Sequence, residues 1–264
     1  MNKPMKELRI LAAACLATQV QKTVERFNAE QSELHAVASI AGSVDCIRRV
    51  RKGEACDLLI LADGAVIESM MMPTHTDGYY IFAGNCMVLV SNLPMKRVDT
   101  SNWKDRLSDP QATFGHFDPS SDPAGYRAVM ACMLADSVAP GLAKTLLNHP
   151  GRTVMTSSTG HVDYAITYRT VPIAKKMSYA YLPDTMDLSN PAFNAHYASA
   201  TVDIDGDGTN LVRASAINHA LTIPFVSKEP EAARDFIDLF LQTDFKAQGF
   251  LARRAQVGNW SQRV

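Results

Sequence analysis

The stretch LRILAAACLATQVQKTVERFNAE, from Leu8 to Glu30, combines an apolar run with an amphipathic run. The apolar run, Leu8 to Cys15, predicts a buried strand. The large apolar residues of the second run are spaced by four and then three positions, at Val20, Val24 and Phe27. This spacing predicts a helix from Thr18 to Glu30 that packs on the strand. A strand followed directly by such a helix is typical of α/β folds with a parallel sheet.

The same alternation continues along the chain and indicates two α/β blocks. In the first block we expect strands at Leu34–Ile40 and Cys56–Ala62 and a helix at Val44–Arg51. In the second we expect strands at Ala112–Phe117 and Tyr164–Tyr168, helices at Tyr126–Asp136 and Pro140–Leu147, and a short helix beginning near Ser158. A last amphipathic helix, Ala232–Leu241, has a start signal at Ser227 and Glu229.

Two apolar stretches are candidates for connections between the blocks. Tyr79–Asn92 predicts one strand long enough to pass from one lobe into the other, and Ala214–Val226 predicts a return strand. A chain of 264 residues is long enough for two lobes with separate cores. We therefore expect lobe I to comprise residues 1–82 and 215–264, and lobe II residues 83–214.

Composition and charge exclude several classes of protein. Apolar residues make up 47% and charged residues 20%, which is typical of a globular protein. The 26 basic and 27 acidic residues nearly cancel, whereas nucleic-acid binders normally carry a basic excess, so we expect no nucleic-acid partner. The five cysteines form no C-x-x-C pair, and no apolar run reaches the roughly 18 residues of a membrane span.

The first residues imitate a secretion signal, because Lys3, Lys6 and Arg9 precede an apolar run that ends at Cys15. We favour a buried first strand, since the helix that follows packs on it and cleavage would remove an element of the fold. The sequence thus carries no convincing export signal, and both an extracytoplasmic and a cytoplasmic location stay open.

Three turns place small or hydroxyl residues where a strand leads into a helix: A-A-C at Ala13–Cys15, A-G-S at Ala41–Ser43 and D-P-A-G-Y-R at Asp122–Arg127. Helix starts present unpaired N–H groups and the positive end of the helix dipole. Small side chains let an anion approach those groups. The three turns therefore predict an anion site at the carboxyl ends of the strands.

Seven short motifs in a fixed order resemble the archaeal-type tungstate/molybdate-binding proteins. They are A-G-S-V-D-C-I-R-R (41–49), L-A-D-G (61–64), M-M-P (71–73), F-A-G-N (82–85), D-P-A-G-Y-R (122–127), D-Y-A-I-T-Y-R-T (163–170) and L-T-I-P (221–224). The resemblance covers about Leu8 to Gly249. It implies an α/β, two-lobed type II periplasmic-binding-protein fold with two crossover strands and the ligand in the cleft between the lobes.

The resemblance also implies which residues bind the ligand. They are Ala14, Cys15, Ser43, Asp122, Ala124, Gly125, Ser158, Thr167 and Tyr168. Cys15 replaces the usual serine of the first turn, and Ala124 stands where the family commonly has cysteine and acts through its backbone N–H. Tyr168 falls on the tyrosine that donates its hydroxyl to the oxyanion, and the N–H groups near Ser157 and Ser158 fall in the fourth contact loop.

The family's two metal-ligating carboxylates fall on Asp122 and Thr167, so only the aspartate is present. A dianion cannot donate a hydrogen bond, and a lone carboxylate beside it repels unless it ligates the metal or is itself paired. Arg127 could pair with Asp122. We expect a tetrahedral ion, with Asp122 as a possible ligand to its metal and no other metal site. Tungstate or molybdate is favoured, and sulfate and phosphate are alternatives.

Two further motifs have structural interpretations that we prefer. The run D-I-D-G-D-G (Asp203–Gly208) resembles the start of a calcium loop, but its twelfth position is Ala214, and a hairpin turn explains it better. The methionines of Met70–Met72 are better explained by packing than by metal binding.

The function expected from the sequence is capture of a small oxyanion, without catalysis and without a cofactor, by a monomer that delivers its ligand to an ABC-transporter permease if it is exported. Two alternatives stay open. One is a binder of the same fold for a small organic anion. The other is a cytosolic sensor or an enzyme built on this fold, in which Cys15 at its helix start would be a reactive thiol.

Overall fold

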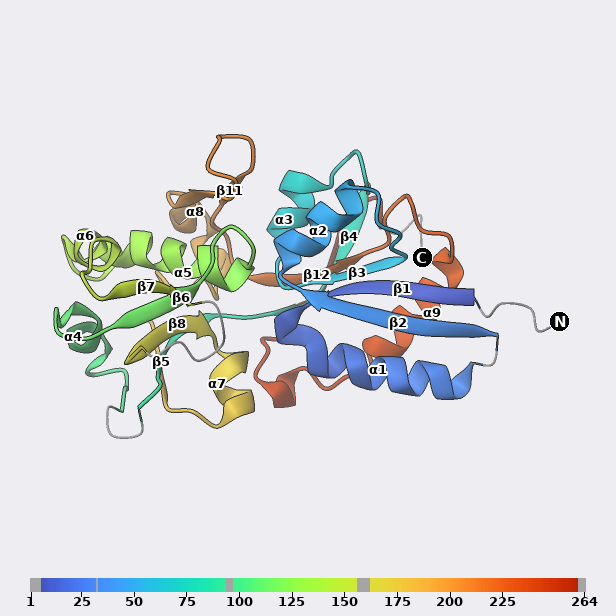
Figure 1. Cartoon of the computed structure of the whole chain (residues 1–264). Coiled ribbons are helices and arrows are strands. Elements are labelled where there is room, and N and C mark those ends of the chain that lie inside the picture. Colours follow the sequence, from blue (N-terminus) through green and yellow to red (C-terminus); the bar gives the residue numbers. More distant parts are fainter. Residues whose placement is uncertain (1–5, 32, 94–96, 156–161, 261–264) are drawn as a thin grey trace. The chain divides into compact units, whose positions relative to one another are not determined.

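The computed structural model of the chain describes residues 6–31, 33–93, 97–155 and 162–260 (Figure 1). The chain divides into two compact units. Unit 1 comprises Met1–Ala83, Asn218–Phe245 and Ala252–Val264, and unit 2 comprises Gly84–Ile217 and Lys246–Leu251. The chain therefore passes from one unit to the other after residues 83, 217, 245 and 251.

The described residues of unit 1 form a six-stranded sheet with the order β13-β4-β12-β3-β1-β2. Its strands are β1 (Lys6–Ala13), β2 (Leu34–Ala41), β3 (Leu58–Leu61), β4 (Gly78–Gly84), β12 (Asn218–Thr222) and β13 (Ala255–Gly258). Its helices are the 3-10 turn η1 (Ala14–Leu16), α1 (Ala17–Glu30), α2 (Ser43–Arg51), α3 (Gly64–Met70) and α9 (Pro230–Phe240). β1 pairs in parallel with β2 and β3, as the alternation of strands and helices predicts.

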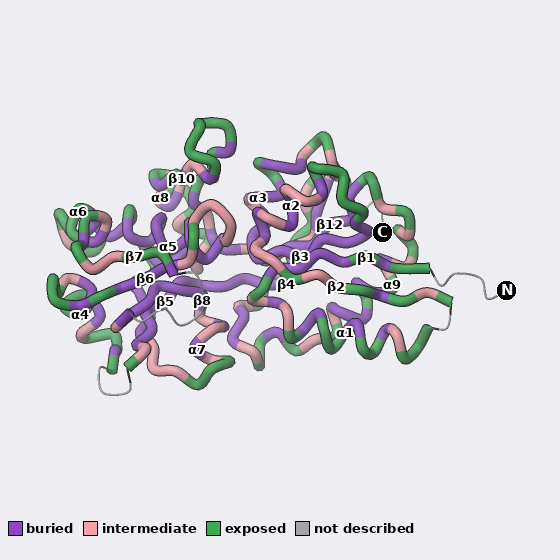
Figure 2. Tube along the Cα trace, in the orientation of Figure 1, coloured by how far each residue is buried: buried purple, intermediate pink, exposed green. Residues whose placement is uncertain are grey.

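The core of unit 1 lies between this sheet and its helices. The four residues of β3 are fully buried, and α1 turns Val20, Val24 and Phe27 inward, as its spacing predicts. The ring of Phe27 packs 5.6 Å from the ring of Phe236 on α9. Figure 2 shows the central strands buried and the outer sides of α1 exposed.

The start of helix α9 is capped by a buried carboxylate from a different part of the chain. Asp57 accepts hydrogen bonds from the Ser227 hydroxyl at 3.1 Å, from the N–H of Lys228 at 2.8 Å and from the N–H of Glu229 at 3.2 Å. Its other oxygen accepts the N–H of Arg9 at 2.9 Å. The Ser227 side chain was expected to cap this helix, and the structure instead assigns that role to Asp57, because its carboxylate accepts several donors at once.

The described residues of unit 2 form a five-stranded sheet with the order β7-β6-β8-β5-β9 and a two-stranded sheet of β10 and β11. The strands are β5 (Met87–Ser91), β6 (Phe114–Phe117), β7 (Arg152–Met155), β8 (Tyr164–Tyr168), β9 (Tyr179–Tyr181), β10 (Thr201–Asp203) and β11 (Leu211–Arg213). The helices are α4 (Trp103–Ser108), α5 (Pro123–Met133), α6 (Leu142–Leu147), α7 (Thr170–Lys175) and α8 (Asn194–Tyr197), with 3-10 turns η2 (Leu134–Ser137), η3 (Pro191–Phe193) and η4 (Lys246–Gln248).

Helix α5 is the main helix of the unit 2 core. All of its residues from Pro123 to Cys132 are buried, including the charged Arg127. On the sheet, a buried apolar cluster includes Val88, Val90 and Ala165. The α/β fold predicted from the sequence is therefore confirmed in each unit.

Two strand predictions are wrong in extent. Tyr79–Asn92 is not one strand but two, β4 and β5, which belong to different sheets and are separated by Asn85 and Cys86. The side-chain oxygen of Asn85 accepts the N–H of Cys86 at 2.9 Å, and this local hydrogen bond competes with strand pairing at that point. The predicted return strand Ala214–Val226 is reduced to β12. The short helix expected near Ser158 lies outside the described residues.

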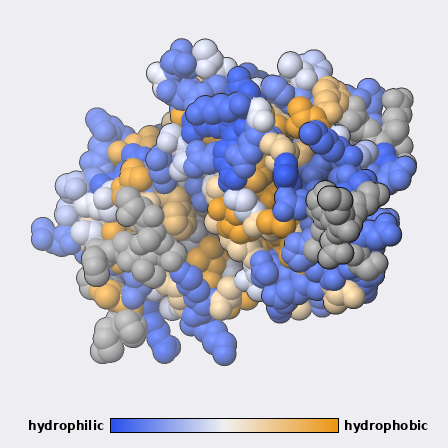
Figure 3. All heavy atoms as spheres, turned by 45° about the vertical axis from the view of Figure 1, so that its right-hand side comes forward, coloured by the Kyte–Doolittle hydropathy of each residue, from blue (hydrophilic) through white to orange (hydrophobic). Residues whose placement is uncertain are grey.

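The surface seen in Figure 3 is largely hydrophilic, with smaller apolar areas between the polar side chains. Scattered apolar side chains are normal on protein surfaces. Among the described residues, no helix combines the length and apolar character that a membrane span requires.

Candidate functional site

In unit 1, the first two predicted turns lie next to each other. Ala13 and Ala41, the last residues of β1 and β2, are partners in the parallel register. The chain enters η1 directly after Ala13 and α2 two residues after Ala41. Cys15 in the first turn is half-buried and forms no disulfide. The structure therefore brings Ala14, Cys15 and Ser43 to one edge of the unit 1 sheet.

Ser43 is the first residue of α2 and is fully buried. Its hydroxyl oxygen accepts a hydrogen bond from the N–H of Ala62 at 3.0 Å. Ala62 follows β3, which pairs with β1, so a third turn joins the first two. A serine hydroxyl that accepts one hydrogen bond still has its own proton to donate. Within the described ranges, no residue is recorded as an acceptor for the Ser43 proton.

The turn after β3 also contains a buried aspartate that the sequence analysis did not single out. Asp63 is 1% exposed, and its carboxylate accepts the N–H of Ala65 at 3.1 Å at the start of α3. Fully buried His219 lies within electrostatic reach of Asp63. Burial lowers the pKa of His219 to about 3, and the negative charge of Asp63 opposes that shift only in part. His219 is therefore neutral at neutral pH.

In unit 2, the D-P-A-G-Y-R turn forms the start of α5. The Asp122 carboxylate caps the helix by accepting the N–H of Ala124 at 2.8 Å. The Ala124 N–H, predicted to contact the ligand, thus has a protein acceptor in the structure. A ligand oxygen would have to share or replace that acceptor. Because Asp122 sits at the positive end of the helix dipole, its negative charge is favourable there.

Gly125 has a packing role that the sequence analysis did not anticipate. A Cβ atom on Gly125 would lie 2.5 Å from the carbonyl oxygen of Phe117 and 2.6 Å from that of Asp118. Glycine therefore lets the first turn of α5 approach the carboxyl end of β6. Its value as a ligand-binding residue stays a prediction.

Arg127 is a fully buried cation one turn into α5. Its guanidinium donates to the carbonyl oxygen of Ser215 at 2.8 Å and lies 5.6 Å from the ring centroid of Tyr126. The expected pairing of Arg127 with Asp122 stays a prediction. The guanidinium keeps a fixed positive charge inside unit 2.

Thr167 and Tyr168 are the last two residues of β8, and both are buried. Successive side chains of a strand point to opposite faces, so these two point to opposite sides of the sheet. One compact ion can contact both the Thr167 and the Tyr168 side chain only beyond the carboxyl end of the strand, where ligands of α/β folds commonly bind. The Thr167 hydroxyl has no hydrogen-bond partner among the residues that the structure describes.

The strand pairing of unit 2 brings the ends of β6 and β8 to one edge. β6 and β8 are parallel, with Gly115 next to Ala165. Two residues after Gly115, β6 ends at Phe117, which leads to the α5 turn. Two residues after Ala165 on β8 lies Thr167. Ser158 and Ser157, the predicted fourth contact loop, lie outside the described residues.

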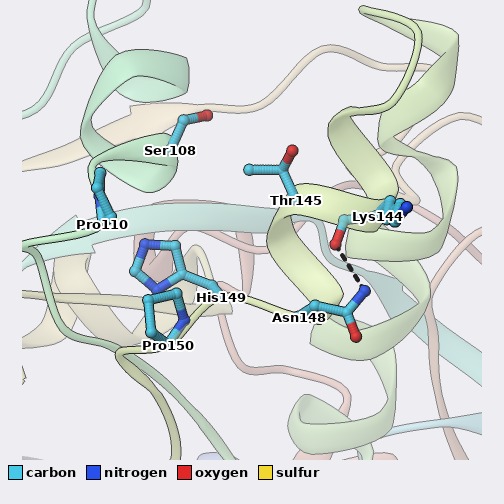
Figure 4. Close-up of a pocket in the computed structure, with 7 residues that line it drawn as sticks. All are labelled: Ser108, Pro110, Lys144, Thr145, Asn148, His149 and Pro150. Atoms are coloured by element: carbon cyan, nitrogen blue, oxygen red, sulfur yellow. Dashed lines mark hydrogen bonds between the residues drawn. The ribbon is translucent and has the colours of Figure 1, made fainter.

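A surface pocket of about 510 Å³ in unit 2 contains none of the predicted site residues (Figure 4). It is lined by Ser108, Pro110, Lys144, Thr145, Asn148, His149 and Pro150. The Thr145 hydroxyl donates to the carbonyl oxygen of Gly141 and the Asn148 amide donates to that of Lys144, at 3.1 and 2.9 Å. These two donors bind the protein itself, and the pocket is also lined by the cation Lys144.

The remaining motifs have the structural roles expected of them. β10 and β11 pair in an antiparallel hairpin whose turn contains the D-I-D-G-D-G run, so the hairpin interpretation is confirmed. Met70 and Met71 are buried in unit 1. Among the described residues, no group of three or more histidine, cysteine or acidic side chains is arranged to hold a metal ion.

Four of the five cysteine thiols are unreactive at neutral pH. Burial raises the pKa of Cys46, Cys56, Cys86 and Cys132 to about 12. These thiols are therefore protonated at neutral pH and are poor nucleophiles. Cys15, which is only half-buried, is the cysteine that a thiol-based alternative would have to use.

Comparisons with known proteins agree with this architecture. A solute-binding protein from Methanoculleus marisnigri is 29% identical, over 89% of this chain and 77% of its own length. The molybdate/tungstate-binding protein WtpA from Thermococcus kodakarensis is 25% identical, over 85% and 75%.

Solved structures share the fold at lower identity. The periplasmic molybdate-binding protein of Azotobacter vinelandii matches with a TM-score of 0.64 and 14% identity, covering 93% of this chain and 99% of that one. The sulfate-binding protein SubI of Mycobacterium tuberculosis matches with a TM-score of 0.57 and 16% identity, covering 93% and 86%. The periplasmic-binding-protein fold expected from the sequence is thus confirmed. Residues 8–251 match the family described as bacterial extracellular solute-binding protein, and the chain belongs to that family.

Proposed function

We propose that this solute-binding protein captures a small tetrahedral oxyanion, with tungstate or molybdate the preferred ligand. The candidate ligand-binding groups of unit 1 lie at the turns of Cys15 and Ser43. Those of unit 2 lie at the start of α5 and the end of β8.

The proposal rests mainly on two buried hydroxyls, Ser43 in unit 1 and Thr167 in unit 2. Neither has a recorded acceptor for its proton among the described residues. Burying a polar group without its hydrogen bond costs about 1–3 kcal/mol. Fully ionised molybdate, tungstate and sulfate only accept hydrogen bonds, so such an ion could accept the proton of either hydroxyl. The starts of α2 and α5 add backbone N–H groups and favourable dipoles.

The charges near the site favour a tetrahedral ion over one with an expanded metal coordination. Of the two positions at which the family has a metal-ligating carboxylate, only Asp122 is an acid, and it already accepts the Ala124 N–H. Thr167 adds a hydroxyl where a second carboxylate would be needed to raise the coordination number of the metal. A neutral hydroxyl donates a hydrogen bond to an oxygen atom of the ion and does not replace a carboxylate as a ligand to its metal.

The names of similar proteins support the choice of ligand class. Those from Thermococcus kodakarensis and Azotobacter vinelandii are named for molybdate or tungstate, and the one from Mycobacterium tuberculosis is named for sulfate. Because the family is extracellular, we propose that the loaded protein delivers its ion to the permease of an ABC transporter.

Isothermal titration calorimetry and thermal shift with tungstate, molybdate, sulfate, phosphate and small carboxylates test the proposal. Tungstate or molybdate should bind most tightly and raise the melting temperature, because ligand binding to the folded state alone stabilises it. X-ray absorption of the tungstate complex should show four oxygen neighbours. An ion bound through extra carboxylate oxygens would contradict the tetrahedral geometry.

The alternatives give different results in the same experiments. A binder of small organic anions would respond to carboxylates and not to the oxyanions. For the thiol alternative, a Cys15→Ser variant is decisive. An oxyanion binder should keep most of its affinity, since serine also offers a donor at that turn, whereas a thiol enzyme would lose its activity.

A further inference from the structure

The segment Lys246–Leu251 belongs to unit 2, although the chain on both sides of it belongs to unit 1. Two backbone hydrogen bonds hold its end to the start of unit 2. The N–H of Gly84 donates to the carbonyl oxygen of Leu251, and the N–H of Leu251 donates to that of Gly84, both at 2.8 Å. We call residues 246–251 the strap.

Arg169 fastens the middle of the strap. Its Nε donates to the carbonyl oxygen of Gly249 at 2.8 Å, and its Nη2 donates to the same oxygen. The guanidinium also lies 6.0 Å from the ring centroid of Tyr181, which holds it in place. Hydrogen bonds from a charged donor are about twice as strong as neutral ones, so this is a strong local attachment.

The backbone conformation of the strap at Gly249 allows this attachment. Gly249 is buried and has φ +88°, a conformation that favours glycine. A Cβ atom on Gly249 would lie 2.4 Å from Cδ1 of Ile173 on α7. Close contact with α7 therefore depends on the absence of a side chain at this position.

Arg169 also adjoins the end of β8. It directly follows Tyr168, and its own N–H donates to the carbonyl oxygen of Cys86 at 3.0 Å. The next residue, Thr170, accepts a hydrogen bond from the Asn85 amide at 3.2 Å. The backbone that carries Tyr168 is thus held both by the start of β5 and, through the Arg169 side chain, by the strap.

The geometry points to Arg169 as a positioning residue that fastens the strap to the end of β8 within unit 2 and thereby fixes the backbone that carries Tyr168. This inference rests on the proposed function for its effect on the ligand.

The attachment itself is tested without a ligand, by hydrogen exchange in the full-length protein. In an Arg169→Ala variant, the amides of Gly84 and Leu251 should exchange at least about ten-fold faster, since the loss of a charge-assisted hydrogen bond shifts a local equilibrium by that order. Arg169→Lys keeps one charged donor and should give an intermediate rate. Arg152→Ala is the matched control, because Arg152 also donates to a backbone carbonyl, of Leu147 at 2.8 Å, away from the strap.

The effect on the ligand is tested by stopped-flow release of molybdate. Arg169→Ala should release the ion several-fold faster than the wild type, because the backbone that carries Tyr168 is then held less firmly. Arg152→Ala should leave the release rate unchanged even if it lowers the melting temperature. Equal exchange at Gly84 and Leu251 in the Arg169→Ala and Arg152→Ala variants would overturn the inference, as would unchanged release.

A second pair of variants tests the attachment by changing a residue of the strap itself. Gly249→Ala should detach it by strain and by contact with Ile173, whereas Gly53→Ala has a similar φ of +91° with open space around it and serves as the control. If the wild type binds no oxyanion, the proposed function fails, and the exchange experiment alone still decides whether Arg169 holds the strap.

Discussion

Replacing Ser43 with alanine removes a buried hydroxyl that bonds the Ala62 N–H at 3.0 Å and that we assign to the ligand. A hydrogen bond to a charged group contributes about 1.5–3 kcal/mol, so the dissociation constant for molybdate should rise by about ten- to 150-fold. The Ala62 N–H also loses its acceptor in a buried setting, which should lower the free energy of unfolding by about 1–3 kcal/mol.

Calorimetric titration with molybdate measures the first effect, and urea unfolding without ligand measures the second. Ser91→Ala is the matched control. Ser91 is also a buried serine, and its hydroxyl donates to the carbonyl oxygen of Leu93 at 2.9 Å, but it pairs with Tyr164, at the far end of β8 from Tyr168. Ser91→Ala should lose stability and keep its affinity. Equal affinity of Ser43→Ala and the wild type would refute the role of Ser43.

Three further predictions concern the frame around the site. Asp57→Ala should lower the free energy of unfolding by about 2–4 kcal/mol, because four donors lose their acceptor, and Asp57→Asn should cost less. Gly125→Ala should cost about 1–3 kcal/mol and weaken molybdate binding, since its Cβ would meet the Phe117 carbonyl oxygen at 2.5 Å. Burial raises the pKa of Asp187 from 3.8 to about 6, so the folded state binds the Asp187 proton more tightly than the unfolded state does. As the pH falls from about 7 to about 4, the free energy of unfolding of the wild type should therefore rise by up to about 3 kcal/mol relative to that of Asp187→Asn.

Urea unfolding decides each of the three. Asp57→Ala with wild-type stability would show that water replaces the carboxylate at the start of α9. A Gly125→Ala variant that binds and unfolds like the wild type would show that α5 can move away from β6. Parallel pH profiles for the wild type and Asp187→Asn would mean that Asp187 titrates alike in the folded and unfolded chains.

Local patterns were sufficient for the regular elements. The spacing of Val20, Val24 and Phe27 predicted the buried side of α1, and the alternation of strands and helices predicted the parallel arrangement of β1, β2 and β3. Both depend on residues close together in the sequence. The strand predicted at Tyr79–Asn92 failed because its apolar composition is the same on both sides of Asn85, so the pattern does not show that β4 and β5 belong to different sheets.

The site shows the same division. Its turns could be located from small residues at helix starts, because helix ends have the same unpaired N–H groups in any fold. The sequence could not show which donors are still available, because that depends on partners elsewhere in the chain. The N–H of Ala62, which donates to the Ser43 hydroxyl, is one such partner.

The sequence by itself thus determined the class of fold and the family, since these follow from periodicity and from motifs within short stretches, and it predicted the turns suited to an anion. Only the tertiary structure decided that Asp57 caps α9, that Gly125 serves close packing on β6, and that the tail returns to unit 2 at Lys246–Leu251. Each of these depends on a contact between residues far apart along the chain, and local sequence carries no record of which distant backbone group will be its partner.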